Sequence, residues 1–244
     1  MQSSSLTARL GQYLELNESE RRTLAQIERG EQSLRAGETL MAESRKSDSL
    51  YIVRQGWMHS SVRSGRDGRQ ILMFHYAGDL IGTSSIAWAW AATTLTAVSD
   101  CVVTPVPKVS LGLLFKAQPR IAGLLYAIAA AENVAMSDRL TSIGRMEATD
   151  RLSTLLLDVL ARLRVTAGGI VDSFDLPLTQ TDIGDALGLT KVHVNRTLRA
   201  LERNGSIERN GRRIRIIDEV SLISVTGFID RYSEVATDWL PAAS

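Results

Sequence analysis

The stretch LTQTDIGDALGLTKVHVNRTLRALERNGSI, residues 178–207, decides the fold of the C-terminal part of this chain. Thr179 and, three residues later, Asp182 form a capping-box pattern, which predicts the start of a first helix. Gly188 tolerates a positive φ and therefore permits a tight turn. Thr190 is the expected N-cap of a second helix. The spacing predicts two short helices joined by one turn.

Apolar residues recur in this stretch at spacings of three and four, as they do on one face of a helix. Gly184 is small enough to let the two predicted helices cross closely. The expected inward-facing residues are Ile183, Leu187, Val194, Leu198 and Leu201. The outer face of the second helix is then polar and basic, which suits a recognition helix in a DNA major groove. The alternative is an unrelated helical hairpin with a solvated basic face.

A basic hairpin is expected next, in ERNGRRIRII at 208–217, where Asn210 and Gly211 form a strong two-residue turn pattern. Residues 188–215 hold eight basic and two acidic side chains, a net charge of +6. The whole chain carries +1, so the remainder carries −5, and this local basic patch indicates binding to DNA phosphate. Arg196 is expected to bond guanine bidentately. The predicted DNA-binding residues are Thr179, Gln180, Thr190, Lys191, His193, Asn195, Arg196, Arg199, Arg212 and Arg213.

The first half of the chain follows a different pattern. Short helical turns are expected within 6–35, and apolar and polar residues then alternate loosely from 38 to 107. Glycines punctuate this region, and Asp67-Gly68 is a strong hairpin pattern. The pattern predicts a small antiparallel barrel or roll.

A long helix is expected from Pro119 to about Arg145. It is apolar on two faces, which predicts packing both on its own domain and on the same helix of a second copy; the alternative is a core helix within one domain. The residues assigned to the dimer contact are Ile121, Leu124, Ile128, Ala131 and Ala135. A hinge is expected at 144–147, an amphipathic helix at 150–163 and one more helix within 221–240.

Composition excludes several classes of protein. Hydrophobic residues make up 44% and charged residues 23%, as in ordinary globular chains, and no apolar run reaches the ~18 residues of a membrane span. The N-terminus lacks the pattern of a secretory signal, so the cytoplasm is the expected compartment. We expect no enzyme, because no Gly-rich phosphate loop, paired His/Glu metal spacing or Gly-x-Ser-x-Gly turn is present, and three histidines and one cysteine are scattered.

Residues 20–220 resemble the Crp/Fnr family of bacterial transcription regulators. GETLMAESRKSDSLYIVRQGWM at 37–58 and AGDLIG at 77–82 look like the family's β-roll, and GLTKVHVNRTLRAL at 188–201 looks like its recognition helix. The resemblance implies a homodimer on a pseudo-palindromic operator, with Arg196 at the base-contacting arginine. Val192 and His193 depart from the commoner Glu-Thr pair, so the operator is expected to differ.

The expected fold class is α+β: an N-terminal jelly-roll-like β-roll sensor, a long dimerisation helix and a C-terminal winged helix-turn-helix. The expected domain boundaries are 1–117 for the sensor, 118–146 for the dimerisation helix and hinge, 147–220 for the DNA-binding domain and 221–244 for a C-terminal helical extension.

The sensor departs from the family's cyclic-nucleotide binders. Those proteins follow the glycine at the position of Gly82 with a glutamate, and they place an arginine and a small hydroxyl residue about eight positions later. Here these positions are Thr83, Ala91 and Ala92. A buried phosphate without a positive partner is costly, so cyclic AMP is not the expected ligand. An apolar pocket for an uncharged effector is assigned to Gly82, Thr83, Trp88, Trp90, Thr93 and Thr94, the alternative being that both tryptophans fill the core or contact the long helix.

No cofactor or metal is predicted. An iron–sulfur cluster needs several cysteines, and Cys101 is expected to be inert core. Haem stays an open alternative, because His59 and His75 are candidate axial ligands, although a structural role is the commoner one. The expected partners are double-stranded DNA, a second copy, RNA polymerase if the protein is an activator, and an uncharged small molecule, with no membrane. The competing hypothesis is a signal-binding module that docks a protein, which requires a neutral or acidic recognition face.

Overall fold

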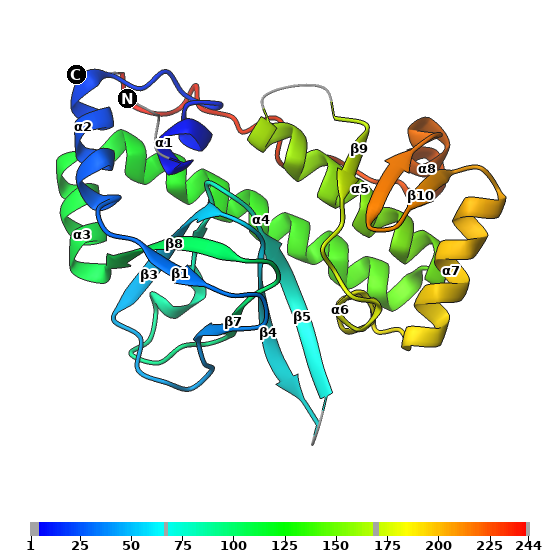
Figure 1. Cartoon of the computed structure of the whole chain (residues 1–244). Helices are drawn as coiled ribbons and strands as arrows, with labels where there is room; N and C mark the ends of the chain where they lie inside the picture. The colour runs from blue at the N-terminus through cyan, green and yellow to red at the C-terminus, as the bar shows by residue number, and fades with distance from the viewer. Residues whose placement is uncertain (1–4, 66–67, 168–170, 243–244) are drawn as a thin grey trace. The chain divides into compact units, whose positions relative to one another are not determined.

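The first half of the chain folds into two four-stranded sheets (Figure 1). The structure is a computed structural model and describes residues 5–65, 68–167 and 171–242. One sheet has the order β1 (Gln32–Leu34), β8 (Cys101–Pro107), β3 (Ser49–Gln55) and β6 (Leu80–Ile81). The other has the order β2 (Thr39–Met41), β7 (Thr94–Ala97), β4 (Met58–Ser64) and β5 (Gly68–His75). The described pairings are antiparallel, so the predicted roll is confirmed.

Side chains from both sheets form one hydrophobic core. Val53 of β3 and Val103 of β8 pack with Met58 of β4 and Leu95 of β7, all fully buried. Alternation explains this, because successive side chains of a strand point to opposite faces: Val53 and Val103 point into this core, whereas Ile52 of β3 belongs to a second core on the other face. Cys101 is buried in the same core, as predicted. The predicted Asp67-Gly68 turn includes Asp67, which lies outside the described residues, but the flanking strands β4 and β5 are present.

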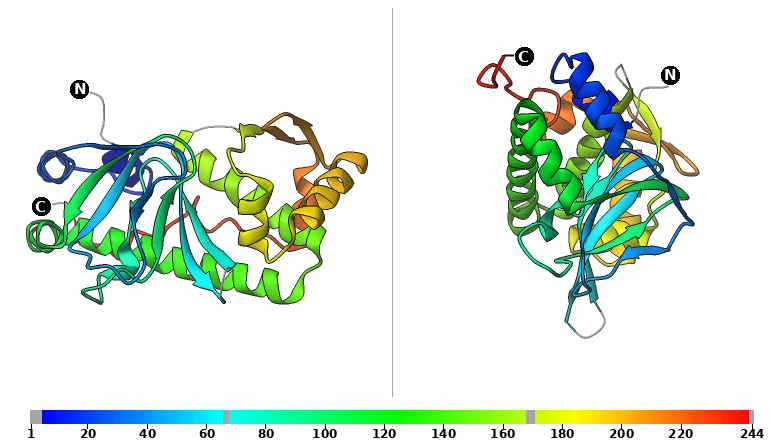
Figure 2. Two further views of the ribbon diagram at one scale, coloured as in Figure 1. Left: turned by 60° about the horizontal axis from the view of Figure 1, so that its bottom comes forward. Right: turned by 90° about the vertical axis from the view of Figure 1, so that its left-hand side faces the viewer.

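A second core lies under the helices of this half. It joins side chains of α1 (Ser5–Leu10), α2 (Glu18–Ile27), α3 (Lys108–Ala117) and the start of α4. The short 3-10 helix η1 (Thr83–Ser85) is not part of it. The long helix predicted from Pro119 to Arg145 is α4, and it is unbroken over 27 residues (Figure 2). Among the described residues, no helix is long and apolar enough to cross a membrane.

The C-terminal half begins with α5 (Ala148–Ala167), which contacts the later helices α7 and α8. A three-stranded sheet has the order β10 (Ile207–Asn210), β11 (Arg213–Ile216) and β9 (Ser173–Asp175). Between β9 and β10 lie α6 (Gln180–Leu187) and α7 (Lys191–Arg203), and α8 (Glu219–Thr226) follows β11. This is the predicted winged helix-turn-helix.

The predicted helix within 221–240 is wrong for most of its length. The helix α8 ends at Gly227, whose φ of 64° is left-handed, so its N–H bonds the carbonyl of Ile223 and the helix stops. Beyond this cap, the described residues to 242 hold no further helix.

The chain forms two compact units. The first contains residues up to 62, 72–131 and from 234 onward; the second contains 63–71 and 132–233. Two features differ from the expected domain boundaries: the tip of the β4–β5 hairpin, residues 63–71, belongs to the second unit, and the end of the chain belongs to the first.

Candidate DNA interface

The helix α6 starts at a complete capping box. The Thr179 Oγ1 accepts a hydrogen bond from the Asp182 backbone N–H at 3.1 Å, and the Asp182 carboxylate accepts one from the Thr179 N–H at 2.9 Å. The Thr179 hydroxyl also donates to this carboxylate at 2.6 Å. These bonds satisfy amide groups that a helix N-terminus leaves without a helical partner. The predicted start of the first helix is thus confirmed to the residue.

The turn between α6 and α7 depends on two glycines. Gly188 caps α6 in the left-handed region, with φ of 66°, as predicted. At Gly184, an added Cβ would lie 2.4 Å from the carbonyl oxygen of Leu189. Only a residue without a Cβ therefore allows the turn to approach α6 this closely.

The second helix, α7, is amphipathic as predicted. The Thr190 Oγ1 caps it by accepting a hydrogen bond from the His193 N–H at 3.3 Å. Its inner face is buried and consists of Val194, Thr197, Leu198 and Leu201. Thr197 satisfies its hydroxyl by donating to the carbonyl of His193 at 2.8 Å, so a polar residue fits this face without an unpaired group.

The outer face of α7 and the start of α6 border an open hollow of about 750 Å³, called the α7 hollow below. Its lining residues are Gln180, Lys191, Val192, Asn195, Arg196, Arg199, Glu202 and Arg203. Five of the ten predicted DNA-binding residues line it: Gln180, Lys191, Asn195, Arg196 and Arg199. The other five do not: Thr179, Thr190, His193, Arg212 and Arg213.

Val192 was not among the ten predicted DNA-binding residues, although its departure from the family's usual pair already indicated a different operator. Its side chain is 76% exposed and lies in the α7 hollow, one helical turn before Arg196. An apolar side chain is solvated unfavourably when it is exposed between basic residues, but it suits contact with the methyl group of thymine. In the sequence, this role was indicated only by the position of Val192 in the first turn of the predicted recognition helix.

The cations of this surface fall into two groups. Arg209 is ion-paired with Glu202 at 3.1 Å, and Arg203 donates to the carbonyl of Arg199. Across the described part of the chain, the guanidinium of Arg196 and the ammonium of Lys191 enter no ion pair, and both residues are exposed. These two cations therefore remain available to an anionic ligand at little cost.

The hairpin β10–β11 forms the expected wing. Asn210 pairs with Arg213, so the two turn residues are Gly211 and Arg212, one position later than the predicted Asn210-Gly211 pair; Gly211, the first of them, has a φ of 60°, as a type II′ turn requires. Arg213 donates to the Ser173 hydroxyl at 2.8 Å, which fixes it to β9. Arg212 is exposed in the turn. Both predicted wing arginines are exposed, and of the two it is Arg213 whose guanidinium is engaged in a hydrogen bond to another described residue.

The residues assigned to the effector pocket differ in burial. Trp88 and Trp90 are each 60% exposed, so the alternative that both fill the core is wrong. The Lys108 ammonium donates to the carbonyls of Ser85 and Trp88 at 2.7 and 2.8 Å and fixes the backbone of this loop. Gly82 and Thr93 are buried, and Thr83 and Thr94 are half-buried.

The two histidines considered as haem ligands are both buried, His59 in β4 and His75 at the end of β5. Both have interactions within the chain. Within the described ranges, no three His, Cys, Asp or Glu side chains gather as a metal site would require. Burial raises the pKa of the Cys101 thiol, which disfavours the reactive thiolate.

The residues predicted to form the dimer contact differ in burial. Ile121, Leu124 and Ile128 are buried in the core of the first unit, whereas Ala131 and Ala135 are half-buried. The face of α4 that solvent reaches is a different one, with Tyr126 and Leu140 more than 70% exposed. Of the five residues assigned from the sequence, Ala131 and Ala135 are thus the ones that solvent partly reaches.

Comparison with known proteins agrees with this architecture. Residues 31–118 match the model of the cyclic nucleotide-binding domain, and residues 150–225 match that of the Crp-like helix-turn-helix domain. The chain is 28% identical over 215 residues to the transcriptional activator protein FnrA of Stutzerimonas stutzeri, covering 88% of this chain and 87% of that protein. It is 27% identical over 212 residues to the fumarate and nitrate reduction regulatory protein of Escherichia coli K12, covering 87% and 84%.

A solved structure supports the same relationship. The structure of FixK2 from Bradyrhizobium japonicum matches with a TM-score of 0.72 and 30% sequence identity. The match covers 80% of this chain and 96% of that chain, so both halves of the molecule are included.

Proposed function

The chain belongs to the Crp/Fnr family of DNA-binding transcription regulators, and we propose that it acts in the cytoplasm as a homodimer on a pseudo-palindromic operator. The observation that carries this proposal is the α7 hollow, with its exposed Arg196 and Lys191 on a recognition helix. A major groove admits a helix of this kind, and two-fold related helices read two half-sites. Catalysis has no part in the proposal.

Arg196 is assigned to base readout and Arg212 to backbone contact. Both arginines are exposed, but Arg196 lies in the first turns of α7, whereas Arg212 lies at the tip of the wing. An arginine in the first turns of a recognition helix reaches guanine O6 and N7, and one at a wing tip reaches phosphate.

Selection of bound sites from genomic DNA tests this assignment. We expect one enriched sequence with two-fold symmetry, and Arg196→Ala should remove most of the preference for it over a scrambled duplex in a gel shift while the oligomer stays intact. Arg29→Ala, an exposed arginine in the other unit, serves as the matched control. Unchanged affinity of the Arg196 variant would remove the recognition-helix assignment.

For the dimer, we propose the solvent-exposed face of α4. Tyr126, Asn133 and Leu140 are exposed at spacings of seven residues, so they share one side of the helix. Leu140→Glu should give a monomer in sedimentation velocity, because it places a charge in the apolar contact. Val109→Glu, equally exposed on α3, should leave the dimer unchanged. A dimeric Leu140 variant would contradict this face.

The sensor is proposed to act without cyclic AMP. Ala91 is buried and Ala92 half-buried where a phosphate-binding arginine and hydroxyl would be needed, and neither side chain offers a donor. Cyclic AMP should leave the melting temperature unchanged. A clear rise, which tight binding produces by linkage, would overturn this part of the proposal.

A further inference from the structure

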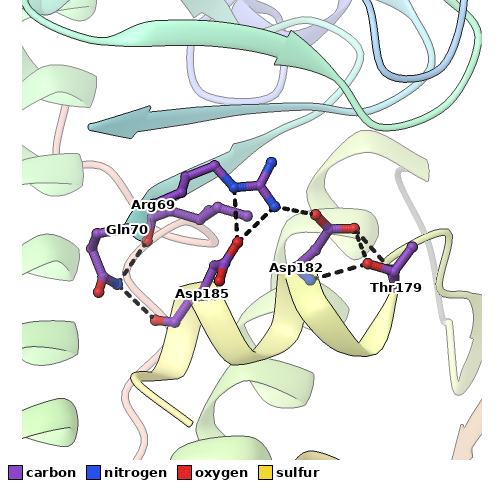
Figure 3. Close-up of polar contacts among 7 residues, drawn as sticks. Arg69, Gln70, Thr179, Asp182 and Asp185 are labelled. Atoms are coloured by element: carbon purple, nitrogen blue, oxygen red, sulfur yellow. Dashed lines mark hydrogen bonds and ion pairs between the residues drawn. The ribbon is translucent and has the colours of Figure 1, made fainter. Parts of the chain in front are cut away.

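Arg69, near the tip of the β4–β5 hairpin, forms charged hydrogen bonds with α6 (Figure 3). The Arg69 Nη2 donates to Asp182 Oδ1 at 2.7 Å, and it lies 2.7 Å from Asp185 Oδ2. The Arg69 Nε donates to the same Asp185 oxygen at 2.8 Å. One guanidinium therefore holds two carboxylates of the same helix, which is the planar, forked geometry that favours arginine over lysine.

This contact reaches the capping box itself. The Asp182 Oδ2 receives the bonds from Thr179, while its Oδ1 receives the bond from Arg69. Burial opposes ionisation of Asp182, but the bonds from Thr179 and Arg69 outweigh it and lower the pKa of this carboxyl. The side chain of Asp182 is 16% exposed, so these interactions are only partly screened by water.

The other end of α6 is held as well. The last carbonyls of a helix have no helical donor, and Ala186 accepts a bond from Gln70 Nε2 at 3.3 Å and from Arg139 at 3.2 Å. Arg151 donates to the next carbonyl, that of Leu187, at 3.2 Å. Two adjacent hairpin residues, Arg69 and Gln70, thus contact both the first and the last turn of one eight-residue helix.

The hairpin lies on the side of α6 away from the α7 hollow. At about 100° per residue, Asp182 and Asp185 point about 200° and 140° from Gln180, the residue of α6 that lines the hollow. The contact therefore leaves the DNA-facing side open. It fixes where α6 lies, and α6 in turn carries α7 through the close crossing at Gly184.

We propose that Arg69 is a positioning residue for DNA binding, which holds α6 through Asp182 and Asp185 and so sets the placement of α7 in the major groove. The inference rests on the proposed function. Without Arg69, two carboxylates of α6 lose their counter-charge, and the helix samples placements that do not bind. Apparent affinity falls with the fraction of molecules in the competent placement.

Quantitative binding to the selected duplex tests the proposal. Arg69→Ala should weaken binding roughly tenfold, within the usual range of coupling between sites. The slope of log affinity against log salt should stay unchanged, because Arg69 contacts carboxylates and no phosphate. A slope reduced by about 0.9 would identify Arg69 as a direct phosphate contact and overturn the proposal.

Charge exchange supplies the decisive control. Asp185 is the better partner to exchange, because Asp182 also caps α6. Asp185→Arg alone should weaken binding by repulsion from Arg69, and the double variant Arg69→Asp with Asp185→Arg should restore at least half of the lost binding free energy. Arg69→Lys, which keeps the charge but not the fork, should lie between the wild type and Arg69→Ala.

The outcomes separate this inference from the proposed function. Unchanged affinity of Arg69→Ala, or failure of the double variant to recover binding while its circular dichroism is native, overturns the positioning role alone. If the wild-type protein selects no sequence, the proposed function fails and the positioning role fails with it. Arg29→Ala should match the wild type in every measurement.

Discussion

Gly184 and Leu189 meet at the tightest point of the helix-turn-helix: a Cβ on Gly184 would lie 2.4 Å from the Leu189 carbonyl oxygen. The Leu189 N–H donates to the Gly184 carbonyl at 3.0 Å, so the two backbones are joined at this crossing. The contact fixes how α6 presents α7.

Gly184→Ala should therefore destabilise the protein. A backbone oxygen must move to admit the methyl group, and overpacking of this kind costs about 1–3 kcal/mol. The measurement is the free energy of unfolding in urea, followed by circular dichroism. Gly144→Ala is the matched control, because Gly144 lies in the last turn of α4 in the same unit with nothing within 4 Å of its Cβ position. This control should be neutral or slightly stabilising, so equal losses in both variants would contradict the crossing argument.

Val192 should contact a thymine methyl group. Val192→Ala should weaken binding to the selected duplex about fourfold: of the two carbons that the variant lacks, we expect one to contact the thymine methyl group, and one buried methylene-sized group contributes about 0.8 kcal/mol. Replacing the contacted thymine with deoxyuridine should cost the wild type a similar factor and cost the variant nothing further. Val220→Ala, on α8 and 80% exposed, is the control. Additive losses would show that the side chain and the methyl group do not touch.

The two exposed arginines should differ in their salt dependence. Arg196→Ala should relax base preference at one position by about 1–3 kcal/mol, because a bidentate contact to guanine is lost. Arg212→Ala should weaken all sequences alike and reduce the slope of log affinity against log salt by about 0.9, because a phosphate contact is lost. Titration of both variants on selected and scrambled duplexes at several salt concentrations distinguishes the roles. A reversed pattern would exchange them.

Asp182 should make stability sensitive to acid. Its pKa is lower in the folded protein than in the unfolded chain, where it is about 3.9, so its ionised form favours folding. This contribution is complete above about pH 5 and is lost as pH falls through the unfolded value toward the lower folded one. The free energy of unfolding of Asp182→Asn should therefore fall less steeply below pH 5 than that of the wild type. Asp175→Asn, exposed on β9, is the comparison, and equal steepness in all three proteins would contradict the prediction.

Much of the DNA-binding half is encoded locally. The capping box of Thr179 and Asp182, the left-handed Gly188 and the hairpin turn at Gly211 each depend on residues within a few positions of one another. Apolar periodicity likewise identified the inner face of α7 and the full length of α4. Such patterns are legible in a sequence because the interactions that they describe close over one or two turns.

The end of α8 shows where local patterns mislead. Apolar residues continue at helical spacing beyond Gly227, yet the glycine adopts a left-handed conformation and stops the helix. The tryptophans mislead in a similar way, because large apolar side chains suggest burial, whereas Trp88 and Trp90 are exposed. They lie on a loop whose backbone carbonyls, at Ser85 and Trp88, accept hydrogen bonds from the Lys108 ammonium.

The sequence by itself determined that this chain carries a helix-turn-helix with a basic outer face, because caps, turns and apolar spacing are local properties. Only the tertiary structure decided which side of α4 is open, which cations border the α7 hollow and what holds α6 in place. Arg69 lies 113 residues before Asp182 in the chain, and no spacing rule links two residues so far apart. Their contact exists because two folded segments meet, and that depends on the packing of the whole unit.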